Sequence, residues 1–174
     1  MKRLIPCLAL LLAACGGSTP PPPAKVGTGT APVDTRLMDR NKVYAEHEEQ
    51  DIRDWMARNG EDMNASGTGL RWKLVRDLPG DPARPEELAV VNFAVFLLNG
   101  DTCYVSDAGK PTAFRIEHAD VESGLQEGIQ HLSPGDSAVL VIPSALAFGL
   151  LGDRDKIPMR STIIYHVGLV ALKR

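Results

Sequence analysis

The chain has 174 residues and a formal net charge of −3 at pH 7, with 19 Lys and Arg against 22 Asp and Glu. This length suits one folded domain with extensions. Aromatic residues make up 5% of the chain, and Lys and Arg do not cluster beyond its first residues. This composition argues against a nucleic-acid-binding surface, so we expect no nucleic acid among the partners.

The first residues have the pattern of an export signal. Two basic residues precede an apolar run, Leu4–Ala14, which is shorter than the roughly 20 residues that a membrane-spanning helix needs. The run ends in Leu-Ala-Ala-Cys-Gly, which resembles the lipobox of bacterial lipoproteins. The resemblance implies a signal peptide over residues 1–14, lipidation of Cys15 and a membrane anchor that holds the domain outside the cytoplasm. Gly16 after Cys15 resembles sorting to an outer membrane, with the domain facing the periplasm. The alternative is an ordinary secretory signal with a chance Cys.

Residues 15–33 are predicted to be a tether between membrane and domain. They contain Pro20-Pro21-Pro22-Pro23 with Gly, Ser and Thr around it, and such a segment cannot bury apolar surface. A proline-rich motif that binds a partner is the alternative interpretation.

Cysteine usage agrees with export. Cys7 lies in the signal and Cys15 would carry the lipid, so only Cys103 remains in the mature domain. No intramolecular disulfide can form, and a hydrophobic core must stabilise the fold. We expect Cys103 to be a small buried hydrophobe rather than a catalytic thiol.

Residues 34–66 are predicted to form a helical arm. From Thr35 to Asn59 the apolar residues recur on one side at about 100° per residue, with charged residues opposite. They are Leu37, Met38, Tyr44, Ile52, Trp55 and Met56. Asn41 and Glu48 interrupt this apolar face. Two roles stay open, since the arm can pack on its own domain or contact a second copy of the chain.

Residues 67–174 carry the strand patterns of the main domain. Leu70–Val75 alternates apolar and charged residues, and Leu88–Leu98 is long and apolar. Asn99-Gly100 is a strong hairpin signal because both residues tolerate positive φ. Further strands are expected at Asp101–Val105, Ala113–Ile116, Ala138–Ile142 and Thr162–Leu172, and a short amphipathic helix carries Leu125, Ile129 and Leu132 on one face. We predict an α+β fold, in which a five-stranded antiparallel sheet wraps around one short helix and an N-terminal helix comes first.

The C-terminal half resembles the FKBP-type peptidyl-prolyl cis-trans isomerases. That family has a Gly-x-x-x-Gly helix, a Gly after its turn, an Ile-Pro-Ser strand end, an aromatic-Gly pair and a Gly…Ile-Pro loop. Here these are Gly124 and Gly128, Gly135, Ile142-Pro143-Ser144, Phe148-Gly149, and Gly152 with Ile157-Pro158. The resemblance implies an FKBP-like domain over residues 67–174 that acts on proline-containing unfolded or exported polypeptides. It implies no cofactor and no metal, since the barrier of about 18–20 kcal/mol comes from amide resonance.

The resemblance also implies a site. Catalytic positions fall on Phe93, Tyr104, Phe114, Phe148 and Tyr165, and substrate-binding positions fall on Val121, Glu122, Leu125 and Ile157. Four of these positions differ from the family pattern in side chain: Phe93 stands where a Tyr is common, Glu122 replaces an Ile, Leu125 replaces the Trp of the pocket floor, and Phe148 replaces a Tyr.

The family's Phe-Asp pair after the hairpin reads Cys103-Tyr104, so we expect the pocket to lose its carboxylate. Because Phe148 has no hydroxyl, we expect Tyr104 or Tyr165 to supply one from another wall.

These departures leave two functions open: a membrane-anchored isomerase that assists folding of exported proteins, or a binding or chaperone module with little turnover. Several exported FKBP-type proteins pair through N-terminal helices, which keeps a homodimer open for the arm. The four His residues have no metal-binding spacing. An acid/base pair of Asp153 and Asp155 with Glu122 is disfavoured, because acidic residues are common in loops and at helix starts.

Overall fold

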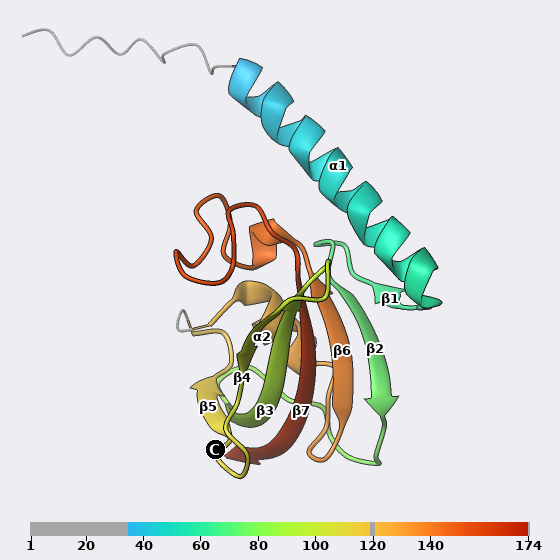
Figure 1. The fold of residues 1–174 in the computed structure, drawn as a ribbon. Helices are drawn as coiled ribbons and strands as arrows, with labels where there is room; N and C mark the ends of the chain where they lie inside the picture. Colours follow the sequence, from blue (N-terminus) through green and yellow to red (C-terminus); the bar gives the residue numbers. More distant parts are fainter. Residues whose placement is uncertain (1–34, 119–120, 174) are drawn as a thin grey trace, which may run out of the picture. The chain divides into compact units, whose positions relative to one another are not determined.

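The computed structural model describes residues 35–118 and 121–173 (Figure 1). The predicted signal peptide, Cys15 and the tether lie outside the described residues. The elements are, in chain order, α1 (Thr35–Asn59), β1 (Asn64–Ala65), β2 (Arg71–Arg76), β3 (Leu88–Leu97), β4 (Thr102–Val105), β5 (Thr112–Arg115), α2 (Ser123–Ile129), β6 (Ser137–Ile142), the 3₁₀ turn η1 (Ser144–Leu146) and β7 (Ile163–Lys173).

One antiparallel sheet forms the centre of the domain. Its strand order is β1-β2-β6-β7-β3-β4, and β5 also pairs with β3. The predicted α+β class with an N-terminal helix is confirmed, but the predicted count of five strands is wrong, because seven strands pair among the described residues. The difference lies in short strands. Asn64–Ala65 pairs with β2 over two residues, and β4 and β5 pair with different parts of the long strand β3.

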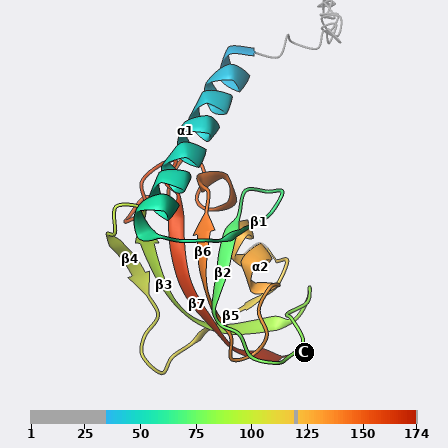
Figure 2. The ribbon, with the colours of Figure 1, turned by 90° about the vertical axis from the view of Figure 1, so that its right-hand side faces the viewer.

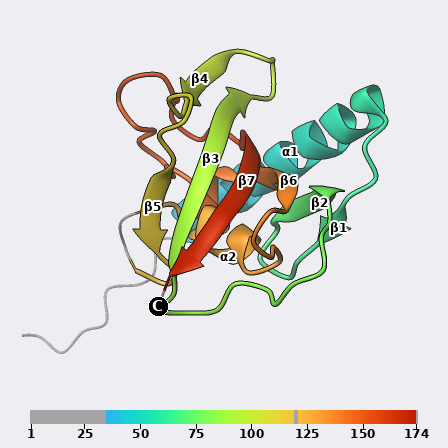
Figure 3. The same ribbon diagram turned by 90° about the horizontal axis from the view of Figure 1, so that it is seen from below.

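Both faces of the sheet are covered by helices, and the pleat of β6 shows how. Leu140 and Ile142 belong to the main core, which also contains Leu125 of α2. Val139 and Val141 point to the opposite face, where they pack in a second cluster with residues of α1. Both sets of side chains are buried, which explains why β6 is a continuous apolar run rather than an alternating one. Seen from below, α2 lies close against the strands (Figure 3).

The predicted helix Thr35–Asn59 is confirmed, and its two halves differ in environment. Ile52 is fully buried against β6 and β7, so the second half packs on its own domain. The last turns of α1 lie over the upper ends of these strands (Figure 2). Leu37, Met38 and Tyr44 in the first half are 47–60% exposed. Within residues 35–118 and 121–173, no helix has both the length and the apolar character needed to span a membrane.

Two glycines allow α2 to approach the sheet closely. A Cβ atom at Gly128 would lie 2.4 Å from Cδ1 of Leu140, and one at Gly124 would lie 2.3 Å from Cγ2 of Ile142. Real Cβ atoms do not approach so near, so the Gly-x-x-x-Gly spacing of α2 sets its distance from β6. The floor of the cavity described below depends on that distance, since Leu125 projects from the same helix.

We expect Gly128→Ala to lower the free energy of unfolding by about 1–3 kcal/mol, because overpacking a core has that cost. The direction is opposite to that of helix propensity, which favours Ala over Gly by about 1 kcal/mol. Gly67→Ala is the matched control, since a Cβ there meets nothing within 4 Å and Gly67 does not have a positive φ. Denaturant unfolding measures both variants, and equal stability of the two would contradict this account of the packing.

Candidate active site

A cavity of about 710 Å³ opens between the sheet, α2 and the loop that joins β6 to β7. Its walls come from β3, β4, β5 and β7, from the start of α2 and from the β6–β7 loop. All the residues predicted as catalytic or substrate-binding, except Ile157, line it: Phe93, Tyr104, Phe114, Val121, Glu122, Leu125, Phe148 and Tyr165. The structure therefore brings together side chains that are up to 72 positions apart in sequence (93 to 165).

The pairing of β3 with β7 positions the aromatic wall. Val95 lies opposite Tyr165 and Phe93 opposite Val167, so residues two apart on β3 face the same side of the sheet. The rings of Phe93 and Tyr165 are tilted by 50° with centroids 5.8 Å apart, a separation at which aromatic pairs attract. Phe114 of β5 is 5% exposed and closes the neighbouring wall.

The start of α2 forms the next wall, and Leu125 is 3% exposed at its floor. Glu122 directly precedes the helix. Its Oε1 accepts a hydrogen bond of 3.1 Å from the Tyr165 hydroxyl. Burial, together with the negative charge of Glu122, raises the pKa of Tyr165 far above its ordinary value, so this hydroxyl keeps its proton. Glu122 therefore has a defined partner inside the cavity.

A carboxylate enters the cavity from the β6–β7 loop. Asp153 lines the cavity, and the Tyr104 hydroxyl of β4 donates a short hydrogen bond to its Oδ2. The same hydroxyl lies 3.3 Å from Oδ2 of Asp155. The expectation that the pocket loses its carboxylate is therefore wrong. The hairpin position has no carboxylate, but Asp153 provides one from 49 residues further along the chain.

Asp153 also organises the loop around it. Its Oδ1 accepts from the backbone N–H groups of Asp155 at 2.9 Å and Ile157 at 2.8 Å. Partial burial raises the pKa of Asp153, but the hydrogen bonds from Tyr104 and from these N–H groups outweigh it and hold the pKa below its ordinary value. The loop closes tightly at Gly152, where a Cβ atom would lie 2.2 Å from the Ile157 carbonyl oxygen.

Ile157 is placed differently from the other predicted site residues. Its side chain is 2% exposed and packs in the main core, and it is not among the residues that line the cavity. Its backbone contact with Asp153 links it to the site indirectly. Ile157 thus supports the loop, and its predicted role as a wall residue has no counterpart in this geometry.

The two tyrosine hydroxyls expected to serve a ligand already have acceptors. Tyr104 donates to Asp153 and Tyr165 donates to Glu122, and each hydroxyl has a single hydrogen to give. Phe148 lines the rim without a hydroxyl. Within the described residues, the backbone N–H of Glu122 makes no hydrogen bond. That N–H belongs to a residue that lines the cavity, at the start of α2.

Other reactive groups in the neighbourhood have structural roles. Cys103 is 3% exposed, and burial raises the pKa of its thiol, which keeps it protonated, as expected for a small buried hydrophobe. Across residues 35–118 and 121–173, no three His, Cys, Asp or Glu side chains are arranged to hold a metal ion.

A model of the FKBP-type peptidyl-prolyl cis-trans isomerase family matches residues 80–170, just over half of the chain. The chain belongs to this family. It is 32% identical over 114 residues to the FKBP-type peptidyl-prolyl cis-trans isomerase FkpA of Escherichia coli K12. It is 33% identical over 99 residues, 51% of this chain and 74% of the relative, to FK506-binding protein 2 of Dictyostelium discoideum. The crystal structure of FkpA from Escherichia coli superposes with a TM-score of 0.65 at 29% identity, over 79% of this chain and 64% of that one.

The likeness to FkpA covers only part of that protein. The alignment takes in 64% of this chain but 40% of FkpA, so the chain spans less than half the length of that relative. The family and the fold are therefore established, and activity, substrates and partners are treated below as proposals.

The Tyr104–Asp153 pair predicts a measurable titration. Hydrogen bonding to Asp153 raises the pKa of Tyr104 from 10.0 to about 12, so the stabilising contribution of this hydroxyl is present below pH 10 and is lost as the pH rises through about 12. Asp153→Asn removes the charge and should shift the pKa of Tyr104 back toward 10. Ultraviolet difference titration measures this, with Tyr104→Phe identifying which transition belongs to Tyr104. An unchanged Tyr104 transition in Asp153→Asn would show that the pair does not form.

Proposed function

We propose that the domain is a peptidyl-prolyl cis-trans isomerase that acts on proline-containing unfolded or exported polypeptides. The observation that carries the proposal is the cavity itself, in which Phe93, Phe114 and Leu125 present apolar surface beside the aromatic ring of Tyr165. Such a cavity suits a proline ring and excludes water from the neighbouring amide. Membership of the isomerase family supports the same activity.

The proposed mechanism requires no nucleophile. Rotation about the X-Pro bond is slow because it breaks amide resonance, at a cost of about 18–20 kcal/mol. A site accelerates it when it binds the twisted amide more strongly than the planar one. Apolar walls that hold the ring and exclude water favour that state, and so does a donor to a carbonyl oxygen, for which we propose the Glu122 N–H, unpaired among the described residues.

Substitutions in the cavity test the activity. Phe148→Ala removes a wall side chain and should lower kcat/KM on a proline peptide about tenfold, the equivalent of roughly 1.4 kcal/mol of transition-state binding. Leu150→Ala is the matched control, because Leu150 belongs to the same loop, is 58% exposed and does not line the cavity. A protease-free assay measures both variants.

The reference for loss of activity is the double variant Phe114→Ala, Leu125→Ala, with circular dichroism to check that it is folded. If the unmodified domain is no faster than this variant, the proposal of isomerase activity is wrong.

A second candidate function is that of a binding or chaperone module with little turnover. Large apolar side chains stay exposed on two surfaces, Leu37 and Met38 on α1 and Leu151 and Met159 on the β6–β7 loop. Such surfaces can hold unfolded chains without any catalysis. This function would show as suppressed aggregation of an unfolded client that contains no proline, and a failure to suppress would count against it.

We further propose that the protein acts in the cell envelope, anchored through a lipid on Cys15 and facing the periplasm from the outer membrane. The apolar run and the Ala-Ala-Cys-Gly sequence support this placement. A diacyl group gives stronger anchoring than a single acyl chain, which binds only reversibly.

Cys15→Ser should abolish incorporation of labelled fatty acid and release the chain into the soluble envelope fraction. The matched control is Cys7→Ser, which changes a thiol inside the predicted signal and should leave labelling unchanged. Labelling that persists in Cys15→Ser would contradict the lipid anchor.

A further inference from the structure

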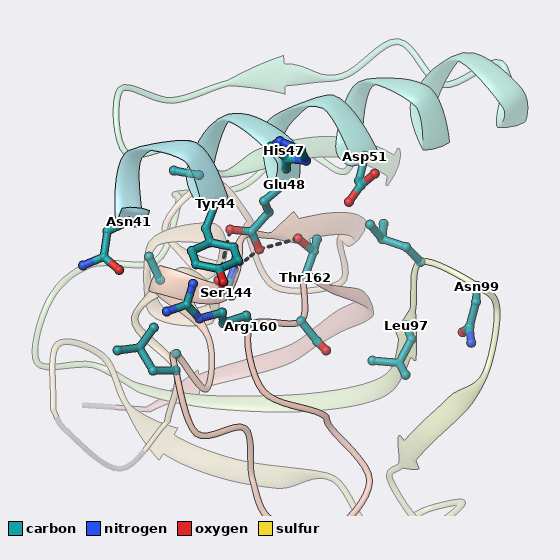
Figure 4. Close-up of a pocket in the computed structure, with 16 residues that line it drawn as sticks. Asn41, Tyr44, His47, Glu48, Asp51, Leu97, Asn99, Ser144, Arg160 and Thr162 are labelled. Carbon is teal, nitrogen blue, oxygen red and sulfur yellow. Dashed lines mark hydrogen bonds between the residues drawn. The ribbon is translucent and has the colours of Figure 1, made fainter. Parts of the chain in front are cut away.

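Glu48 interrupts the apolar face of α1, and the structure gives this residue a specific partner. Its side chain is partly buried and points from the helix toward the β6–β7 loop (Figure 4). One oxygen, Oε1, accepts from the Ser144 backbone N–H at 2.6 Å and from the Thr162 hydroxyl at 2.7 Å. The other, Oε2, accepts from the Ser144 hydroxyl at 3.0 Å. Three donors thus converge on one carboxylate.

These donors mark the two ends of the loop. Ser144 follows β6 after Pro143, and Thr162 directly precedes β7. Ile142 and Ile163 are register partners in the sheet, so the loop leaves and re-enters the sheet at adjacent points. A single carboxylate can reach both ends for this reason. Ser144 and Thr162 are 9% and 4% exposed, so neither has free access to water in place of Glu48.

The loop between these ends supplies one side of the active-site cavity. Ala147, Phe148 and Asp153 line that cavity from residues 144–162. The outer side of the same loop faces a different cavity, of about 620 Å³, whose lining includes Tyr44 and Leu150. Continuous packing therefore does not support the loop from outside.

On its inner side the loop is held by Ile157, which packs in the main core, and by the hydrogen bond from Tyr104 to Asp153. On its outer side the loop contacts α1. The Arg160 guanidinium lies 3.7 Å from the centroid of the Tyr44 ring, which gives a second link to α1. Arg160 has a φ of 55°, an unfavourable conformation for a residue with a side chain, and its N–H donates to the Gly149 carbonyl at 2.9 Å. Because the loop contains this unfavourable backbone conformation, its ends must be held in place for the loop to keep its shape.

We propose that Glu48 is a positioning residue for the isomerase site: from α1, it fixes both ends of the β6–β7 loop and so holds the loop-side wall of the cavity in its binding conformation. The inference rests on the proposed function for its catalytic consequence, but its structural part does not. It also assigns α1 a role inside its own domain that its apolar face alone does not reveal.

Hydrogen–deuterium exchange on the full chain tests the structural part. Glu48→Ala should speed exchange in residues 144–162 by roughly tenfold or more, since buried donors lose a charged acceptor. Exchange in the hairpin at Asn99-Gly100 should stay unchanged. Glu46→Ala is the matched control, because Glu46 lies on the same helix, is exposed and, within the part of the chain that the structure describes, pairs only with exposed Lys42. Glu48→Gln keeps an acceptor without the charge and should give an intermediate rate.

Glu48→Ala can also loosen α1 itself, so a second variant acts from the loop side. Thr162→Val removes a single hydroxyl of nearly the same shape and leaves the packing of Ile52 in place. It should speed exchange in the loop in the same direction but by less. Combined with Glu48→Gln, its effect should be smaller than the sum of the two, as for groups that share one interaction.

Steady-state kinetics on a proline peptide should show a change in KM without a matching change in kcat. A loop that is ordered only part of the time binds peptide more weakly in proportion to that fraction, while saturating peptide restores order. KM in Glu48→Ala should therefore rise by roughly three- to tenfold with kcat nearly retained. Partial loss of folded protein would instead lower kcat and leave KM unchanged.

The outcomes separate the two proposals. Equal loop exchange in Glu48→Ala and Glu46→Ala would overturn the positioning role, whatever the activity. Faster exchange with an unchanged KM in an active protein would overturn it too, because loop order would then not serve binding. If the unmodified chain shows no isomerase activity, the proposed function fails, and the exchange rates still decide whether Glu48 orders the loop.

Discussion

Ten residue pairs join β3 to β7, from Leu88 opposite Lys173 to Leu97 opposite Ile163. This pairing determines where the rest of the site lies. The pleat sends alternate residues of β3 to the cavity, and the fixed register places Tyr165 beside Val95. A slip of one residue would turn Phe93 toward the opposite face and remove the aromatic wall. The close approach of α2, which its glycines allow, then closes the floor against these strands.

The β6–β7 loop is the part of the site that the sheet does not determine, and two carboxylates hold it from opposite sides. Asp153 accepts from the backbone of its own loop and from Tyr104, on the cavity side. Glu48 accepts from both ends of the loop, on the outer side. An ionised carboxylate has several acceptor sites, so one side chain can order several donors of a loop at once. The same property makes its removal costly, because each donor then loses its acceptor.

Features that depend on a short stretch of sequence could be predicted, whereas contacts between residues far apart in the chain could not. The bounds of α1 came from helical periodicity over 25 residues, whereas β3 and β6 were predicted from continuous apolar runs, and both signals are local in sequence. The two-residue strand β1 is too short to carry such a signal. The family motifs indicated most of the cavity lining, but they gave no sign of Asp153 or Glu48. Their partners lie 49 and 96 positions away, and only the folded chain brings those pairs together. The one sequence feature that pointed to Glu48 was its position as a charged residue within the apolar face of α1.

The departures from the family pattern are coupled through this loop. The carboxylate missing after the hairpin is replaced by a Tyr104 hydroxyl, and the hydroxyl finds its carboxylate on Asp153. The polar character of that wall is thereby retained, but its charge now belongs to the loop instead of the sheet. A strand holds a side chain through its ladder of hydrogen bonds, whereas a loop residue is only as well placed as the loop is ordered. With the carboxylate on the loop, its position depends on how firmly the ends of the loop are held. In this chain the group that holds both ends is Glu48 of α1.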